Sequence, residues 1–363
     1  MYLALRDLRF AKGRFALMGG VVALITLLLV LLSGLTAGLG NQSTSALAAL
    51  PADRIVFGAP AGDSPKASFT ESEVTRGQLA GWADRDGVAQ ADLLGISQGR
   101  FQALGPAGNP SGTASVAVFG TEGAALAPAP VSAGTVVIGA SLAADLGLGA
   151  GSRATVGGLE LTVAAVVPDQ WYSHTGVVWT TLDDWRRLAR LTGDAAAATV
   201  IAVTSDGTTL DVGEADAATG TVSATRTGSF QALGSYKSEN GSLLLMQAFL
   251  YGISALVIVA FLTVWTVQRT RDIAVLKALG GSSGYVLRDA MVQATIVLLA
   301  GAGAGGAAGV AGGALASGAA PFLLTAQTTL LPMAGIVLLG LAGAALAVRS
   351  IIRVDPLLAL GGN

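Results

Sequence analysis

Long apolar stretches without charge constrain this chain more than any other feature. The first runs from Phe15 to Gly40 and contains no charged residue. As a helix that rises about 1.5 Å per residue, it would be about 39 Å long, which exceeds the ~30 Å hydrocarbon core of a bilayer. A secretory signal peptide has a shorter apolar core, followed by a small-residue cleavage site. We therefore expect a retained membrane span.

Three further stretches of this kind occur in the second half of the chain. The four predicted transmembrane helices are residues 15–40, 241–268, 289–317 and 330–348. The short uncharged segment 318–329 is expected to be an extracellular turn that joins the last two spans as a hairpin. The predicted fold class is a membrane α-helical protein with four transmembrane helices and a large mixed α/β extracellular domain, residues 41–240, inserted between helices 1 and 2.

Charge distribution predicts the orientation. From Asn41 to Gly241 there are 19 acidic and 11 basic residues, a net charge of −8, whereas the rest of the chain carries +6. Lys and Arg cluster before the first span, between the second and third, and after the fourth. Cytoplasmic flanks retain positive charge, so these three segments and both termini are expected in the cytoplasm, with the acidic insert outside a plasma membrane.

The cytoplasmic segments have distinct patterns. Residues 1–14 alternate apolar and basic side chains and are predicted to form an interfacial amphipathic helix, with a disordered basic tail as the alternative. Residues 269–288 form a cytoplasmic connection, and residues 349–363 form a cytoplasmic tail.

The insert contains short β-branched runs bounded by Gly, Pro, Asp and Asn, which is typical of strands. The expected strands are Arg54–Phe57, Ser115–Phe119, Thr135–Gly139, Ala154–Val156, Leu159–Val167, Gly176–Thr180 and Thr199–Thr204. The expected helices are Thr70–Asp84, with a capping box of Thr70 and Glu73, then Ser141–Leu146 and Leu182–Leu191. Gly157–Gly158 predicts a hairpin turn.

The residue inventory excludes several chemistries. The chain has no cysteine and one histidine, His174, which excludes disulfides, thiol catalysis and multi-histidine metal sites. We expect no intrinsic cofactor, no metal, no enzymatic activity and no nucleic-acid partner. Trp171, Tyr172, His174 and Trp179 lie close together in sequence and could form an aromatic ligand cage, but strand-borne aromatics more often belong to a core. His174 itself is expected to be a surface or hydrogen-bonded residue.

Glycines recur every four residues in the third span, at Gly301, Gly305, Gly309 and Gly313. The run Gly301–Gly306 has no Lys-Ser or Lys-Thr and lies inside an apolar helix, so it is not a phosphate-binding loop. A small-residue stripe on one helix face lets two helices approach closely in lipid. These four glycines are therefore predicted to mediate helix packing.

Apart from Asp289 at the start of the third, the predicted spans contain no charged residue, whereas proton-coupled carriers generally need intramembrane carboxylates or histidines. The chain also has no ATPase motif. If it moves a substrate, another protein must supply the energy.

The segment Gln268–Ala294, "QRTRDIAVLKALGGSSGYVLRDAMVQA", resembles the cytoplasmic segment after the second span of FtsX-like, macrolide-exporter-type ABC permeases. Weaker matches occur at Ala4–Phe15 and at Arg349–Leu360. The resemblance implies a homodimeric permease on two copies of a cytosolic ABC ATPase, which binds ATP and Mg²⁺. It assigns ATPase coupling to Arg271, Ile273, Leu276, Lys277, Leu279 and Gly280.

A physical interpretation of the same residues agrees with this assignment. Ile273, Leu276 and Leu279 share a helical face, and Gly280 can end that helix. An ordinary interfacial helix is the alternative. The resemblance also implies no continuous channel: ATP-driven closure would act through spans one and two on the external domain and expel cargo from the outer leaflet.

Within the family, the haem-efflux permeases of actinobacteria are the most similar, and the alanine- and glycine-rich composition suits a high-GC Gram-positive source. Haem is therefore the first candidate for the cargo. Candidate ligands lie near the outer end of the second span: Met246, Glu239, Tyr236 and Phe249. Helical packing by Met246 and a solvated Glu239 remain the alternative.

Rival functions are export of lipids, peptides or antibiotics, and regulation of a cell-wall hydrolase by mechanotransmission.

Overall fold

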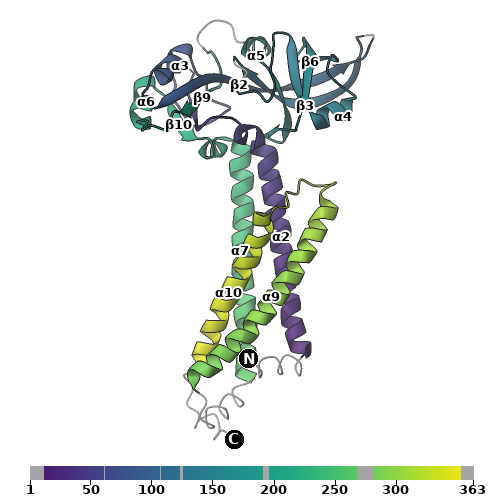
Figure 1. Cartoon of the computed structure of the whole chain (residues 1–363), viewed down its shortest axis with the longest axis vertical. Helices are drawn as coiled ribbons and strands as arrows, with labels where there is room; N and C mark the ends of the chain where they lie inside the picture. Colours follow the sequence, from purple (N-terminus) through teal and green to yellow (C-terminus); the bar gives the residue numbers. More distant parts are fainter. Residues whose placement is uncertain are drawn as a thin grey trace. The chain divides into compact units, whose positions relative to one another are not determined.

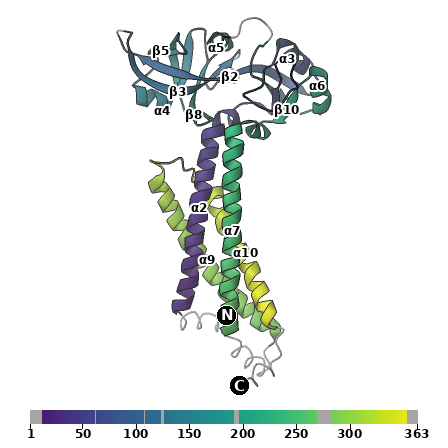
Figure 2. The same ribbon diagram turned by 180° about the vertical axis from the view of Figure 1, so that it is seen from behind.

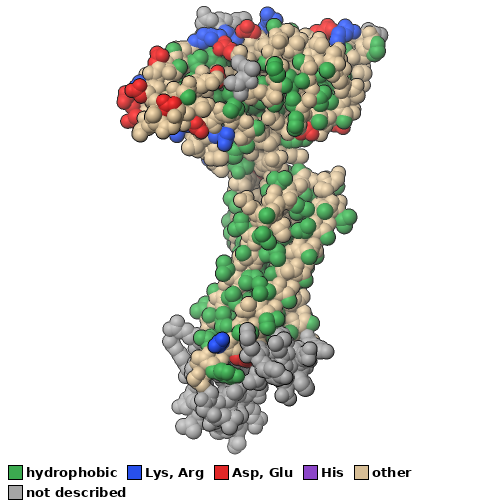
Figure 3. Space-filling model, viewed as in Figure 1, with side chains coloured by type: hydrophobic (Ala, Val, Ile, Leu, Met, Phe, Trp, Pro, Cys, Tyr) green, Lys and Arg blue, Asp and Glu red, His purple; other side chains and the backbone are tan. Residues whose placement is uncertain are grey.

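The structure is a computed structural model that describes residues 12–60, 62–106, 108–122, 126–190, 196–268 and 282–352. The chain divides into two compact units. The helical unit comprises Met1–Leu39 and Gly241–Asn363, and the inserted domain comprises Gly40–Asn240. On the face shown in Figure 3, hydrophobic side chains are spread along the described helices, whereas most acidic and basic side chains lie on the inserted domain.

Four described helices are long and apolar enough to cross a membrane (Figure 1). They are α2 (Lys12–Ala48), α7 (Gly234–Gln268), α9 (Ser283–Ala316) and α10 (Ala326–Ile352). α2, α7 and α10 each contain one predicted span, and α9 covers the third except for its last residue, Ser317. α2 continues past Gly40, and α7 begins before Gly241. The extension of α2 persists because Thr44 donates to the Gly40 carbonyl (2.8 Å) and because Ala46 and Leu47 are buried.

Glycines determine how closely the helices pack. An added Cβ at Gly305 of α9 would overlap the Ala23 carbonyl of α2, and at Gly301 it would lie 2.9 Å from Val22. At Gly309 it would lie 2.9 Å from Val30, also on α2. Three of the four predicted packing glycines thus face α2. In contrast, Gly313 faces Leu324 in the connection between α9 and α10, where an added Cβ would lie 3.1 Å from a side-chain carbon.

The α9–α10 connection is tied to α2 and has its own capping interactions. The Leu323 backbone N–H donates to the Gly34 carbonyl (3.0 Å). Thr325 and Thr328 exchange backbone-to-hydroxyl hydrogen bonds of 2.8 and 3.2 Å at the start of α10. The predicted turn 318–329 is therefore shorter in the structure, since α10 begins at Ala326, and Pro332 lies within α10.

The inserted domain is built on a ten-stranded sheet in its described residues. Its strand order is β10-β1-β9-β2-β3-β8-β4-β6-β5, with β7 paired to β8. Most neighbours are antiparallel, whereas β3–β8 and β4–β6 are parallel. The strands are β1 (Arg54–Phe57), β2 (Val88–Leu104), β3 (Pro110–Thr121), β4 (Thr135–Gly139), β5 (Arg153–Val156), β6 (Leu159–Val167), β7 (Trp171–Tyr172), β8 (Thr175–Thr181), β9 (Val200–Ser205) and β10 (Val222–Thr225).

The long strands β2 and β3 run through the middle of the domain (Figures 1 and 2). Both views place α3 (Arg76–Ala83) and α6 (Val212–Thr219) near one end and α4 (Ala140–Leu146) toward the other, with α5 (Leu182–Leu188) between them. A 3₁₀ helix, η1 (Gly228–Ala232), follows β10.

The sheet has an apolar core on each face because its strands alternate. Along β3, Val116 and Val118 belong to the core that packs under Trp82 of α3 and Trp185 of α5. The intervening residues, Ala117 and Phe119, belong to the opposite core. That second core is completed by Ala46 and Leu47 from the last turns of α2, so α2 contributes directly to the domain.

Several sequence-based boundaries need correction. The capping box is formed by Thr75 and Gln78, so the prediction of Thr70 and Glu73 is wrong and α3 begins at Arg76. The residues before α3 are not helical because they make other contacts. The Ser72 hydroxyl donates to the Thr199 carbonyl (2.7 Å), and Val74 forms a β-bridge with Ala198. The sequence did not predict β2, β7, β10 or α6 as regular elements.

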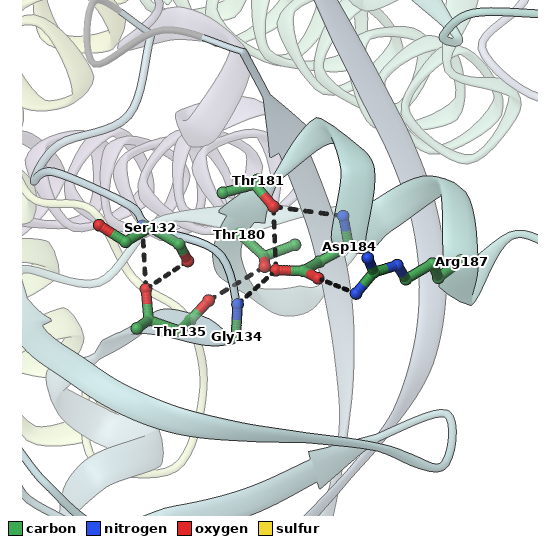
Figure 4. A network of polar contacts seen from close by, with 7 residues as sticks. All are labelled: Ser132, Gly134, Thr135, Thr180, Thr181, Asp184 and Arg187. Atoms are coloured by element: carbon green, nitrogen blue, oxygen red, sulfur yellow. Dashed lines mark hydrogen bonds and ion pairs between the residues drawn. The ribbon is translucent and has the colours of Figure 1, made fainter.

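A buried carboxylate fixes the connection between β4 and α5 (Figure 4). The Asp184 side chain is 1% exposed and accepts hydrogen bonds from the Gly134 N–H (2.8 Å) and the Thr181 hydroxyl (2.9 Å). Arg187 forms a 3.2 Å ion pair with its other oxygen. Asp184 is a structural group, since its oxygens are occupied by groups of the fold.

Asp184→Ala is expected to destabilise the chain by about 2–3 kcal/mol, because it leaves buried donors without an acceptor. Thermal unfolding of the full chain in detergent, followed by near-ultraviolet circular dichroism, measures the loss. The exposed neighbour Asp183 provides the control: Asp183→Ala should stay within about 0.5 kcal/mol of the unsubstituted chain. Equal effects of the two substitutions would contradict a structural role specific to Asp184.

Candidate functional site

The four predicted cargo residues are divided between the two units. Met246 and Phe249 lie on the part of α7 that belongs to the helical unit. Tyr236 and Glu239 lie in the first turns of α7, within the inserted domain. Each pair is described in its own surroundings.

One face of α7 is apolar and uncovered. Met246 is 53% exposed and Phe249 is 64% exposed, and Ile253 and Leu256 continue the exposed face. Spacings of three, four and three residues place these four side chains on one side of a helix. In the most apolar window of α7 only 11% of residues are buried, compared with 33–44% in the other three spanning helices. We call Met246, Phe249, Ile253 and Leu256 the α7 stripe.

The other side of α7 packs within the helical unit. Ser254 and Ile258 are buried, and Gln247 donates a 3.2 Å hydrogen bond to the Thr36 hydroxyl of α2. The Tyr251 ring lies against Gly335 of α10, where an added Cβ would be 3.0 Å from a ring carbon. The stripe is therefore the face of α7 left open by α2, α9 and α10.

Tyr236 is a packing residue. Its ring stands edge-to-face against Phe230 of η1, with centroids 6.0 Å apart, and it packs against the core that α2 completes. This environment holds the ring by apolar contact.

Glu239 is paired with the only histidine of the chain. Its two carboxylate oxygens lie 2.8 and 3.1 Å from the His174 Nε2, which is also 3.1 Å from the Ser43 hydroxyl of α2. His174 and Glu239 are partly exposed, by 31% and 42% of their side chains. This contact joins residues that are 65 positions apart, and the sequence contained no signal for it.

The combination of Ser43, His174 and Glu239 does not form a catalytic triad. In such a triad the imidazole uses one nitrogen for the nucleophile and the other for the carboxylate. Here the same Nε2 approaches both partners. The arrangement cannot relay a proton from serine through imidazole to carboxylate, and its role is to connect chain segments.

Tyr172 and Trp179 belong to the core, as strand-borne aromatics were expected to, and Trp171 is half-buried, so the three rings do not form a cage around His174. Tyr172 is 5% exposed and Trp179 is 1% exposed, and both rings stand edge-to-face against Phe119 at 5.4 and 5.0 Å. Burial raises the pKa of the Tyr172 phenol above its ordinary value. The Trp179 indole N–H donates to Gln170 (2.8 Å). These residues hold the hairpin β7–β8 in place.

Other possible sites are small or open. A cavity of about 160 Å³ next to β7 is lined by Trp171, Asp145 and Asp169, among others. Asp169 accepts hydrogen bonds from the Ser141 backbone and hydroxyl at 2.9 and 2.5 Å, which gives it a capping role. Among the described residues no group of three or more His, Asp or Glu side chains could hold a metal ion.

The predicted ATPase-coupling residues lie outside the described residues. They are Arg271, Ile273, Leu276, Lys277, Leu279 and Gly280. Residues 1–11 of the predicted interfacial helix and 353–363 of the predicted tail also lie outside the described part of the chain.

Two family models match the sequence and together cover most of it. The model of the MacB-like periplasmic core domain matches residues 15–219, and the model of the FtsX-like permease C-terminal region matches residues 244–356. The first of these alone covers more than half of the chain.

Curated relatives match along the full length. Two strains of Staphylococcus epidermidis have a protein named hemin transport system permease protein HrtB that is 23% identical over 371 aligned positions, covering 100% of both chains. The protein of the same name from Staphylococcus haemolyticus is 31% identical over 130 residues, which is 36% of this chain and 37% of that protein.

Two solved structures resemble the chain at 13% sequence identity, each with a TM-score of 0.34. The extracellular domain of the ABC-type transporter YknZ from Gram-positive bacteria aligns over 48% of this chain and 99% of that domain. The periplasmic region of MacB from Actinobacillus actinomycetemcomitans aligns over 49% of this chain and 90% of that region. On the strength of the two family models, the chain belongs to the MacB/FtsX class of ABC-type permeases, with four transmembrane helices and an α/β extracellular domain inserted between the first and second.

Proposed function

We propose that this permease exports a hydrophobic, amphipathic compound from the outer leaflet, with haem as the first candidate, and that it works as a homodimer driven by a separate cytosolic ATPase. The observation that carries the proposal is the uncovered α7 stripe. It presents a thioether, a phenyl ring and branched aliphatic side chains along one helix face. Such a surface suits a flat apolar molecule.

A homodimer would turn the stripe into a slot. In a two-fold dimer the same residues of both copies face each other. Two α7 stripes would then enclose one ligand between two Met246 and two Phe249 side chains. A flat molecule with two apolar faces matches this symmetry, which supports one ligand for each pair of permease chains.

The chain has few side chains of the kinds that bind haem iron, and this limits the candidate ligands. It has no cysteine, and its one histidine is held between Ser43 and Glu239. The thioether of Met246 is a known type of haem ligand. Glu239, seven residues earlier in the sequence, is the second candidate ligand, and Tyr236 or Lys237 could pair with a propionate.

The full-length relatives named as hemin transport permeases support haem as the cargo class. Export of another lipid-like compound uses the same stripe and differs only in the ligand. Regulation of an external hydrolase without transport would need a protein-binding surface outside and no ligand slot on α7. The haem titration below distinguishes the last two possibilities from haem export.

The ATPase would act on the permease through the cytoplasmic segment 269–288. Its resemblance to family coupling segments assigns docking on the ATPase to Ile273, Leu276, Lys277, Leu279 and Gly280, with Arg271 nearby. ATP and Mg²⁺ would bind to the ATPase subunits. Movement of the docked segment would pass to α7, the helix that immediately precedes it, and so change the width of the slot.

Haem titration of the purified full chain tests the cargo. We expect a Soret shift that saturates at about one haem per two chains and that is weakened about tenfold or more in Met246→Ala and in Glu239→Gln, because each removes a candidate ligand. Val264 is the matched control, as it is 57% exposed on the far part of the same helix. Val264→Ala should bind as the unsubstituted chain does. An unshifted spectrum with the unsubstituted chain would rule out haem.

A charge in the coupling segment tests the energy source. Leu276→Asp should leave the permease in the membrane but abolish its stimulation of ATP hydrolysis by the partner, because a carboxylate cannot enter an apolar docking pocket without a large desolvation penalty. Ser282→Asp is the control: Ser282 caps α9 by accepting from the Tyr285 N–H, and aspartate caps equally well. Undiminished stimulation in Leu276→Asp would refute the docking face.

A further inference from the structure

The tip of the β7–β8 hairpin lies between the end of α2 and the start of α7, all within the inserted domain. Its two turn residues, Ser173 and His174, have φ of 49° and 63°. A two-residue turn with both residues in this region is the type I′ hairpin, which strongly prefers Asn-Gly. Side chains other than glycine cost about 1–2 kcal/mol each in this conformation.

The turn contains Ser and His, although Asn-Gly would form the same turn with less backbone strain. Strain of this kind persists where the surroundings determine it, and it often marks a functional position. The side chains of Ser173 and His174 are the groups of the turn that reach α7. Their contacts therefore explain why they occupy the turn.

The hairpin is held to α2 mainly through backbone groups. The Ser173 N–H donates to the Ser43 carbonyl and the His174 N–H to the Gln42 carbonyl, both at 3.0 Å. The Ser45 hydroxyl accepts from the Trp171 N–H at 2.9 Å and returns a 3.5 Å bond to the Trp171 carbonyl. These bonds are made near the point where Ala46 and Leu47 enter the core, so the hairpin and the end of α2 form one body.

The contacts with α7 are of a different kind. They are a 3.2 Å contact between the Ser173 and Ser235 hydroxyls and the His174–Glu239 contact at 2.8 Å. Both use side chains, and those of His174 and Glu239 are partly open to solvent. Exposed side-chain pairs of this type contribute about 0–1 kcal/mol, so they can break and re-form while the bonds to α2 persist.

We propose that the β7–β8 hairpin is a latch: it moves with α2, holds the start of α7 through Ser235 and Glu239, and releases α7 in each ATP-driven cycle. This inference rests on the proposed function, because it supplies the external step of that cycle. Opening the latch lets the outer ends of α2 and α7 move apart. Closing the latch restores the contacts of Ser173 and His174 with α7.

A reversible covalent lock tests the latch. The chain has no cysteine, so Ser173→Cys with Ser235→Cys allows a single disulfide within each chain, where the two hydroxyls now lie 3.2 Å apart. The full chain, with its ATPase in membrane vesicles, is assayed for ATP hydrolysis and for ATP-dependent efflux of haemin. Oxidation should lower both at least tenfold, and reductant should restore them. Loss of both activities that reductant does not reverse would overturn the latch, because that loss would not come from the lock.

A second cysteine pair controls for oxidation itself. Gln102 and Thr155 are directly opposite on β2 and β5, and their side chains are 3.3 Å apart. Gln102→Cys with Thr155→Cys should retain full activity in both redox states. Failure of the Ser173→Cys, Ser235→Cys pair to cross-link, or full activity of the cross-linked protein, would overturn the latch alone. An unsubstituted chain that neither stimulates ATP hydrolysis nor exports haemin would overturn the proposed function, and the latch with it.

An unlatched variant provides the opposite change. Ser173→Asn with His174→Gly supplies the preferred type I′ turn, removes the His174–Glu239 contact and replaces the hydroxyl that contacts Ser235. The thermal midpoint of the full chain should not fall, because turn strain is relieved, whereas ATP-dependent haemin efflux should fall at least threefold. Unchanged efflux in this variant would contradict a role for the latch in the cycle.

Discussion

Two covalent connections constrain how this protein can work. The division between the compact units falls at residues 39/40, inside α2, and at residues 240/241, inside α7. Any work that passes along the chain from the spanning helices to the inserted domain must therefore pass through these two helices. Under the proposed function the permease, which has no ATPase motif of its own, depends on this route to carry movement from its cytoplasmic segment to the inserted domain.

The two helices are built for different roles. α2 is held closely by α9, since glycines at positions 301, 305 and 309 bring the backbones together where a side chain would overlap. In lipid, close packing of this kind replaces the hydrophobic effect as the source of association. α7 has few buried residues and presents the stripe outside the bundle. The same difference recurs in the inserted domain, where the hairpin bonds to α2 mainly through the hairpin's own backbone groups but contacts α7 through side chains.

The sequence predicted the elements whose structure is determined by neighbouring residues, and it missed those that depend on contacts with distant parts of the chain. The spans follow from the absence of charge, and β1, β4 and β6 were predicted at their observed bounds because short β-branched runs between turn residues need little context. β2 was missed because its 17 residues include Asp92, Gly95 and Arg100 and do not alternate cleanly. The capping box was misplaced because Ser72 and Val74 are drawn into contacts with residues more than 120 positions away.

The sequence likewise predicted some features of the candidate site and missed those that depend on distant contacts. Helical spacing alone placed Met246 on one face of α7 with Glu239, and the exposure of Met246 and Phe249 required the packing of three other helices to be known. The pairing of His174 with Glu239 depends on a strand order that brings a hairpin tip to two helix ends, and no short-range pattern encodes it. Glu239 was therefore anticipated as an isolated ligand or a solvated charge, whereas it is already engaged within the domain.

The central claim is that the inserted domain lies outside the membrane while the coupling segment lies inside. Single cysteines in this cysteine-free chain test it with a membrane-impermeant maleimide on intact cells. The account predicts that Glu160→Cys, at a side chain 58% exposed on β6, is labelled in intact cells, and that Ser282→Cys is labelled only after permeabilisation. The reverse pattern would place the domain beside the ATPase and would contradict the account.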